Sequence, residues 1–348
     1  MSPTPLRSRR LWTRSAFAVT AAAALLLAGC SGGGGSAEGN AGSGGDSDAK
    51  ASVDPTAPEQ SKASIVGIRG PGMAPVWVIG QEGVDTDYNI EIRPGWVDNS
   101  GVAVTSVVSG DAAAANSSYF GVIDAVNQGI DLVVVAEGWA SSPGSASLET
   151  LPDSGITKIE DLIGKNVAVV SLNSSHAIKL KDQLLKAGLN PDDVNWVELP
   201  YGQVPAALEQ RTVDASSAVG AVLAQVKNTL KSVTVFDYGG GEYEGMAESG
   251  YIMLRSFVEA NPNTTAAIQC SVSKASKMVK DDRAFYDQFL TKEMGMAPED
   301  ASKINLEDFQ HTIRPKALQQ NADVALNVGT IDKPFDFASI TIPMPDNC

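Results

Sequence analysis

The same order of strand-like and helix-like runs occurs twice along this chain, and that repeat limits the folds open to it. GDAAAANSSYFGVIDAV in the first half and TVDASSAVGAVLAQV in the second share one layout, in which an acidic residue and small residues lead through a turn into a helix. Each is followed by a strand-like run, DLVVVAEG in the first half and SVTVFDYGG in the second. Strands that alternate with helices are typical of an α/β fold. The sequence therefore predicts two similar lobes, each with a parallel sheet.

The order of the elements also predicts where each lobe begins and ends. Residues 62–154 and 247–348 are expected to form a first, discontinuous lobe, and residues 155–246 a second lobe. In open α/β sheets, ligands bind outside the carboxyl ends of the strands, where helix N-termini point. Two such lobes facing each other would place a ligand cleft between them.

The first 61 residues are predicted to serve export and attachment. Arginines precede an apolar run at 16–28, which is shorter than the roughly 20 residues that span a bilayer and is typical of a signal peptide. The run ends in LLLAGC, which closely resembles a bacterial lipobox and implies cleavage before Cys30 and acylation of its thiol by a fatty acid such as palmitate. Residues 1–29 are therefore predicted as a lipoprotein signal peptide, and residues 30–61 as a flexible, Gly/Ser-rich tether.

These segments predict an exported protein that is anchored by lipid to the outer face of the bacterial cell membrane. A short membrane helix that ends in Cys by chance is the alternative interpretation. The two arginines at positions 9 and 10 leave Sec and twin-arginine export both open.

Charge and cysteine content narrow the partners and the redox compartment. The chain has 26 basic and 41 acidic residues, and four basic ones leave with the signal peptide, so 22 against 41 gives the mature chain a net charge near −19. This balance disfavours nucleic acid or an anionic membrane surface as partner. In an exported protein we expect a disulfide between Cys270 and Cys348, the two cysteines besides Cys30. One buried thiol and one frayed terminal thiol is the alternative.

Four passages together resemble the substrate-binding lipoproteins of ABC importers, in the nitrate, taurine and aliphatic-sulfonate group that also includes thiamine-pyrimidine binders. The passages are ITKIEDLIGKNVAVVS, ALEQRTVDASSAVG, SFVEANPNTTAAIQCSVSKASKMV and RPKALQQNADVALNVGTIDKPFDFASI. The resemblance covers roughly residues 64–342. It implies a two-lobe α/β fold of the periplasmic-binding-protein type (type II), a small anionic organic solute captured by hinge closure, and a permease with its ATPase as partners. One departure is SSAVGAV, where the family often has an aromatic–Glu–Pro sequence.

Candidate ligand contacts lie at strand ends and helix starts. Hydroxyl and amide side chains crowd the start of the predicted helix after the strand NVAVVS, where free N–H groups would suit an oxyanion. The same residue types are the best helix caps, so pure capping is the alternative. Arg69 suits a bidentate anion contact or is a solvated turn residue, and Trp139 walls the pocket or covers the hinge. The candidates are Arg69, Met73, Trp77, Asn116, Ser117, Ser118, Tyr119 and Trp139 in the first lobe, and Ser171, Asn173, Ser174, Ser175, Tyr201, Ala218 and Val219 in the second.

Motifs for catalysis, metal or cofactor binding are not found in the sequence. His176 and His311 have no Cys or acidic cluster at ligand spacing, no G-x-S-x-G occurs, and DYGGGEYEG lacks the Lys of a phosphate-binding loop. The prediction is a non-enzymatic solute receptor, a monomer without cofactor. A sensor or scaffold lipoprotein on the same fold is the alternative, and a pyrimidine-synthesising enzyme is less favoured.

Overall fold

The computed structural model describes residues 53–348, so the predicted signal peptide, Cys30 and most of the predicted tether lie outside the described residues. Within this range, no helix combines the length and the apolar character that a membrane crossing requires. The strands and helices predicted from the repeat are present in the predicted order.

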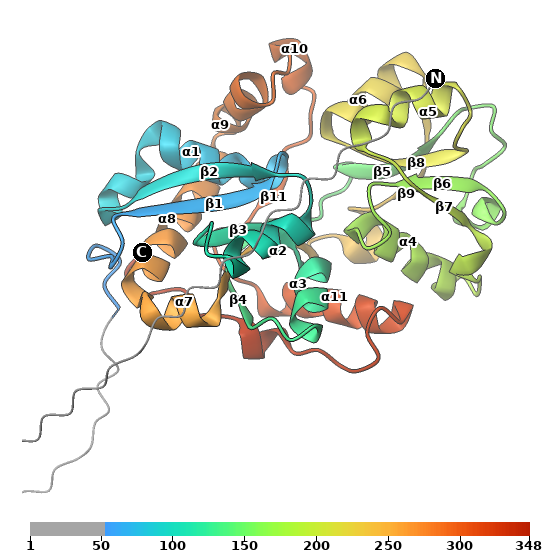
Figure 1. Ribbon diagram of the computed structural model, residues 1–348. Coiled ribbons are helices and arrows are strands. Elements are labelled where there is room, and N and C mark those ends of the chain that lie inside the picture. Colours follow the sequence, from blue (N-terminus) through green and yellow to red (C-terminus); the bar gives the residue numbers. More distant parts are fainter. Residues whose placement is uncertain (1–52) are drawn as a thin grey trace, which may run out of the picture. The chain divides into compact units, whose positions relative to one another are not determined.

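Two mixed sheets organise the described residues (Figure 1). The first has the strand order β11-β4-β10-β3-β1-β2 and the second the order β7-β6-β8-β5-β9. The strands are β1 Lys62–Ile68, β2 Glu91–Val97, β3 Ala114–Ser118, β4 Leu132–Ala140, β5 Ala146–Thr150, β6 Asn166–Val169, β7 Asn195–Glu198, β8 Ala215–Val219, β9 Val233–Asp237, β10 Ala247–Leu254 and β11 Asp308–Phe309. The α-helices are α1 Ala74–Glu82, α2 Ser100–Val108, α3 Tyr119–Asn127, α4 Ser175–Lys186, α5 Val204–Glu209, α6 Gly220–Thr229, α7 Arg255–Ala260, α8 Pro262–Asp281, α9 Arg283–Gln288, α10 Pro298–Ala301 and α11 Pro315–Val328.

Neither sheet is purely parallel, so the prediction of two parallel sheets was wrong. In the first sheet β10 runs antiparallel to β3 and β4, and in the second β5 runs antiparallel to β8 and β9. Both strands follow a passage of the chain from one sheet to the other. We call these passages the first crossing, residues 141–145 between β4 and β5, and the second crossing, residues 238–246 between β9 and β10.

Strand β5 was missed because three of its five buried residues are polar. Its sequence is ASLET, and all five residues are buried. The Glu149 carboxylate accepts hydrogen bonds from Ser147, Ser232 and Thr234, and the last two come from 83 and 85 positions further along the chain. Hydroxyl donors so distant in sequence make a buried carboxylate tolerable but leave no local pattern. The predicted turns before α3 and α6 were also wrong, because β3 and β8 pass directly into these helices.

Residues that alternate along a strand divide between two cores, one on each face of the sheet. In β4, Val133 packs in a cluster with α1 and α8, and Val134 in a cluster with α2, α3 and α11. In β6, Val167 packs with α4, and Ala168 with α5 and α6. This alternation has the period of two that a strand imposes on its side chains. Helices therefore cover both faces of each sheet.

Residues 54–60, predicted as part of the flexible tether, are bound to the fold instead. The Glu59 carboxylate accepts from the backbone N–H groups of Asn263 (3.0 Å) and Thr264 (2.7 Å) at the start of α8. The Asp54 N–H donates to the Asn263 side chain at 2.9 Å. A carboxylate is favourable at a helix N-terminus because it satisfies free N–H groups there. The composition of this segment gave no sign of such a partner 200 positions away.

A disulfide and a buried amide fasten the C-terminal segment to α8. Cys270, which is fully buried in α8, is bonded to Cys348. The neighbouring Gln269 amide donates to the carbonyl oxygens of Val135 (2.8 Å) on β4 and Pro343 (3.2 Å) on the C-terminal segment. The C-terminal segment is thereby held against both α8 and β4.

Replacing Cys348 with Ser is expected to lower the free energy of unfolding by about 4 kcal/mol at most, because the unfolded chain regains the freedom that a crosslink across 78 positions removes. Urea denaturation under oxidising conditions measures the difference. Wild-type protein under reducing conditions is the control and should show the same loss. Equal stability of the variant and the oxidised wild type would contradict the prediction.

Candidate functional site

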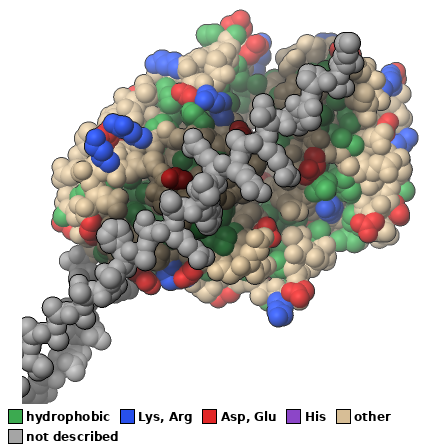
Figure 2. All heavy atoms as spheres, viewed as in Figure 1, with side chains coloured by type: hydrophobic (Ala, Val, Ile, Leu, Met, Phe, Trp, Pro, Cys, Tyr) green, Lys and Arg blue, Asp and Glu red, His purple; other side chains and the backbone are tan. Residues whose placement is uncertain are grey.

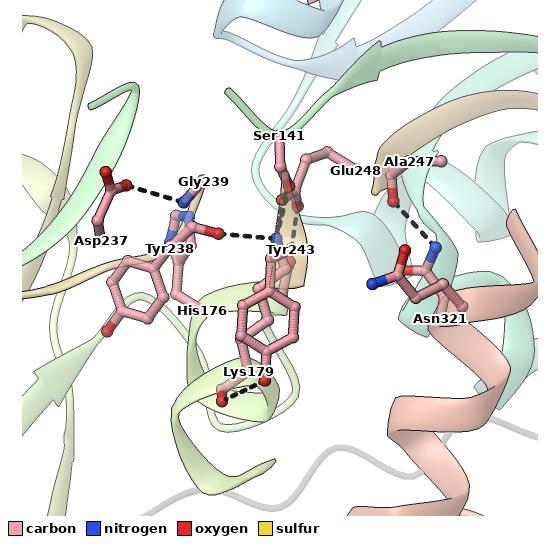
Figure 3. A network of polar contacts seen from close by, with 12 residues as sticks. Ser141, His176, Lys179, Asp237, Tyr238, Gly239, Tyr243, Ala247, Glu248 and Asn321 are labelled. Atoms are coloured by element: carbon pink, nitrogen blue, oxygen red, sulfur yellow. Dashed lines mark hydrogen bonds and ion pairs between the residues drawn. The ribbon is translucent and has the colours of Figure 1, made fainter. Parts of the chain in front are cut away.

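A fully buried ammonium group joins the two crossings to the first sheet. Lys179 on α4 donates to Ser141 Oγ at 2.7 Å, to the carbonyl oxygen of Tyr238 at 3.1 Å, and to the Glu248 carboxylate (Figure 3). Ser141 begins the first crossing, Tyr238 begins the second, and Glu248 lies on β10. An ammonium group has three donors, so all of them are used. We call Ser141, Ser175, Lys179, Tyr238 and Glu248 the Lys179 network.

The Glu248 carboxylate divides its two oxygens between two residues of α4. One oxygen accepts from Lys179 and from Ser141, and the other accepts from Ser175 Oγ at 2.6 Å. Burial acts to raise the pKa of Glu248, but the charge of Lys179 and the surrounding donors outweigh it and hold the pKa below its usual value. Glu248 is therefore an ionised carboxylate whose charge is neutralised inside the protein.

Helix geometry explains why α4 can present these groups together. Ser175, Lys179 and Asp182 follow one another at spacings of four and three, which places them on one stripe of the helix. Asp182 continues the stripe and accepts from Tyr243 and from Asn327 on α11. The apolar residues Leu180 and Leu184 face the core of the second sheet. The apolar side of α4 thus packs on the second sheet, and its polar stripe binds the two crossings, β10 and α11.

Three aromatic rings lie beside this network, and we call them the aromatic group. His176 Nδ1 is 3.0 Å from Tyr201 Oη, and its ring centroid is 4.5 Å from that of Tyr238. Tyr238 Oη is in turn 2.7 Å from Ser217 Oγ on β8. Burial lowers the pKa of His176 to about 4, so its imidazole is uncharged at neutral pH. The aromatic group therefore offers uncharged rings and hydroxyl groups.

On the first sheet, a second set of residues gathers next to Glu248. Ser249 lies opposite Trp139 in the sheet, and its hydroxyl accepts from Asn116 Nδ2 at 3.3 Å. The turn after β1 comes close to them, because a Cβ at Gly72 would lie 2.6 Å from Asn116 Oδ1 and 3.3 Å from Trp139 Nε1. Any larger residue at this position would force the Asn116 side chain to shift.

Residues predicted from the two lobes thus come together around the adjacent residues Glu248 and Ser249 on β10. Ser175 contacts Glu248, and Asn116 contacts Ser249, which pairs with Trp139. Tyr201 joins them through His176, whose imidazole lies within the field of the Glu248 charge. These predicted residues therefore lie around one region of the fold.

Several other candidates have structural partners. Ser174 caps α4 by accepting from the Ala177 N–H at 3.3 Å, and Ser118 caps α3 in the same way. Arg69 lies over the ring of Trp96 and pairs with Glu293, with 2.9 Å between Nη1 and Oε1. Met73, Trp77, Ser117, Tyr119 and Ala218 are buried, while Ser171, Asn173 and Val219 retain exposure. Ligand contact by these residues stays a prediction.

The most densely connected residues were not among the candidates. The sequence patterns did not indicate Lys179, Glu248 or Tyr238 as ligand contacts, and they offered His176 only as a possible metal ligand. The polar stripe of α4 is the one local signal that could have indicated Lys179. Glu248 lies 69 positions from Lys179, and nothing in its local sequence indicates the pairing.

Two pockets with volumes of about 630 and 610 Å³ contain none of the candidate residues. The smaller lies between the crossings and is lined by Ser141, Ser142, Pro143, Gly241, Glu244, Gly245 and Asp308. Among residues 53–348, no three His, Cys, Asp or Glu side chains are grouped to hold a metal ion. On the face shown in Figure 2, acidic and basic side chains form small separate groups rather than one continuous patch.

Comparisons with known proteins address the fold and the family. A family model described as NMT1/THI5 like matches residues 82–284, more than half of the chain. The structure of the alkanesulfonate-binding protein SsuA from Xanthomonas axonopodis pv. citri bound to MOPS is similar at a TM-score of 0.69 and 17% identity, over 82% of this chain and 100% of that one. The periplasmic aliphatic sulphonate binding protein SsuA from Escherichia coli matches at 0.68 and 19%, over 80% and 97% of the chains. The periplasmic nitrate-binding protein NrtA from Synechocystis PCC 6803 matches at 0.68 and 15%, over 82% and 86%.

These likenesses confirm the predicted fold, that of the periplasmic binding proteins. A mutant of the desulfinase DszB, in complex with biphenyl-2-sulfinic acid, also matches, at a TM-score of 0.59 and 15% identity, over 81% of this chain and 96% of that one. A search of curated protein sequences gives no match.

One buried carboxyl generates a pH prediction. Burial, with a smaller contribution from the Glu248 charge, raises the pKa of Glu307 to about 8 from an ordinary 4.5. The folded state then holds a proton that the unfolded state releases, so the free energy of unfolding should fall as the pH rises from about 4.5 to about 8. Glu307→Gln removes this titration. Its unfolding free energy, measured by urea denaturation at several pH values, should lose less than that of the wild type across this window.

The control for this measurement is Glu299→Gln, which changes an exposed carboxyl close by in the chain. It should follow the wild-type pH dependence. If Glu307→Gln also follows the wild type, Glu307 does not hold a proton in the folded protein near neutral pH.

Proposed function

The chain belongs to the NMT1/THI5-like family, and we propose that it is the solute-binding component of an ABC importer. The observation that carries this proposal is the fold, which matches sulfonate-binding and nitrate-binding proteins over four-fifths of the chain. On this proposal, residues 62–140 with 247–348 form one lobe around the first sheet, and residues 146–237 form the other around the second. The boundary predicted at residue 154 was wrong, because β5 pairs with strands of the second sheet. The lobes close on the solute by bending at the two crossings, and the closed form docks on a permease whose ATPase drives import.

The proposal includes the attachment predicted from the N-terminus. The signal peptide exports the chain, and acylated Cys30 anchors it to the outer face of the cell membrane as a monomer. The part of the tether before residue 53 then gives the binding domain its reach.

The solute is a small organic anion on this proposal. The first N–H groups of α4 have no acceptor within their own helix, and helix N-termini favour negative charge. Glu248 lies close by, and Lys179 neutralises its charge, so that it does not repel an anion at the first turn of α4. Asn116 and Trp139 supply N–H donors from the first lobe, and Tyr201 supplies an aromatic ring from the second lobe.

An enzyme is the second candidate, since DszB shares the fold. A lysine nucleophile would need a free amine, and the one buried lysine of this region, Lys179, has all three donors engaged. This arrangement favours a receptor.

A thermal-shift screen of the chain without its signal peptide, stripped of bound solute by unfolding and refolding, tests the proposed function. The panel holds taurine, alkanesulfonates, nitrate, bicarbonate, aromatic carboxylates, pyrimidines and flavins. A true solute at about 100 times its dissociation constant should add roughly 2.7 kcal/mol of stability and raise the melting temperature by several degrees. Mass spectrometry of the recovered solute distinguishes a receptor, which returns it unchanged, from an enzyme.

Bulky replacements at Ser174 and Ser175 should abolish the shift while leaving the melting temperature of the solute-free variant measurable. A matched change at Ser109, an exposed serine at the end of α2, should leave it intact. A shift that survives the changes at Ser174 and Ser175 would remove the start of α4 from the proposed site.

A further inference from the structure

Glu248 connects the start of α4 to the Lys179 network through two separate oxygens. Ser175 Oγ donates to one oxygen at 2.6 Å, and Lys179 and Ser141 donate to the other. Ser175 is the first residue of α4, and Lys179 follows it by one helical turn. The single carboxylate therefore fixes both the position and the rotation of this turn relative to β10.

The same group reaches both passages of the chain between the sheets. Lys179 donates to Ser141 on the first crossing and to the carbonyl of Tyr238 at the start of the second. The two crossings are the segments through which β4 continues into β5 and β9 into β10. Any rotation of one sheet relative to the other changes the backbone of these segments. The Lys179 network therefore contacts the segments whose backbone would change in such a rotation.

The burial of the network makes it a rigid connection rather than an easily deformed contact. Lys179 is 0% exposed and Glu248 is 6% exposed, so neither charge has access to water as a substitute partner. A buried ion without its counter-ion is strongly unfavourable, and the pair must move as a unit. Ser175 has a single hydroxyl proton, which it gives to Glu248. A solute that accepts a hydrogen bond from the Ser175 hydroxyl therefore removes this hydrogen bond from Glu248.

We propose that Glu248 is a positioning residue, which couples a solute at Ser175 to the two crossings and so to the relative placement of the two sheets. This inference rests on the proposed function for the identity of Ser175 as a solute contact. The coupling itself requires no solute, because it lies in the hydrogen bonds of Glu248. Removing either the carboxylate or its Ser175 donor changes the placement of the sheets.

The experiment measures that placement in the absence of solute. The mature chain, residues 30–348 with Cys30→Ser, carries nitroxide labels at Asp98→Cys beyond β2 and at Gln225→Cys on α6, both exposed positions, and double electron–electron resonance gives the distance distribution. Glu248→Gln, Lys179→Met and Ser175→Ala should each broaden the wild-type distribution or shift it by more than about 2 Å. Ser174→Ala is the matched control, since Ser174 bonds only within the start of α4, and it should leave the distribution unchanged.

Wild-type distributions in Glu248→Gln, Lys179→Met and Ser175→Ala would overturn the proposal. A shift in Ser174→Ala as large as that in Ser175→Ala would also overturn it, because loosening of the helix start would then explain the effect. If a single variant leaves one charge buried and fails to fold, the double variant Lys179→Met with Glu248→Leu removes both charges and decides the question, since an apolar pair can replace a buried ion pair. The solute screen is independent of this measurement, so either proposal can fail alone.

Discussion

A buried ammonium group must have all its donors satisfied, and the arrangement of this protein depends on how Lys179 meets that requirement. Its three acceptors come from the first crossing, the second crossing and β10, which are the segments that relate one sheet to the other. Burying an ion pair contributes little net stability, since desolvation offsets the attraction, but removing one partner costs roughly 3–5 kcal/mol. On our proposal, the network therefore adds little to the free energy of folding. Its main effect is to disfavour placements of the sheets that would separate the buried charges. Around it, apolar residues on both faces of each sheet supply the hydrophobic stabilisation.

Most elements could be predicted from the sequence because their signals are local. Val133 and Val134 of β4 lie in a continuous apolar run, and Leu180 and Leu184 of α4 keep the helical period. Strand β5 could not be predicted, because Glu149 is made tolerable by hydroxyl groups far away in the sequence. The antiparallel direction of β5 and β10 could not be predicted either, since it depends on where the chain passes between sheets.

The candidate site shows the same division between local and distant signals. Ser175, Asn116 and Trp139 were predicted as ligand contacts because strand ends and helix starts lie at the ligand site in this class of fold. Glu248, which precedes Ser249 and binds Ser175, was missed because its partners are distant in sequence. Lys179, Ser175 and Ser141 lie 69, 73 and 107 positions before it. Ser174 caps α4, as the alternative interpretation of these serines predicted, whereas the adjacent Ser175 binds Glu248. Two adjacent residues of one type thus have different roles, which composition cannot separate.

The position of β10 has a consequence for the order in which the protein can fold. β10 lies between β3 and β4, yet it is made only after the whole second sheet. As the chain emerges during synthesis, β5 to β9 can assemble from contiguous sequence, while β3 and β4 wait for the strand that separates them. The first sheet therefore cannot close until more than a hundred further residues have followed β4. Contacts between segments so far apart form slowly, so the facing edges of β3 and β4 stay without the strand that separates them until β10 arrives.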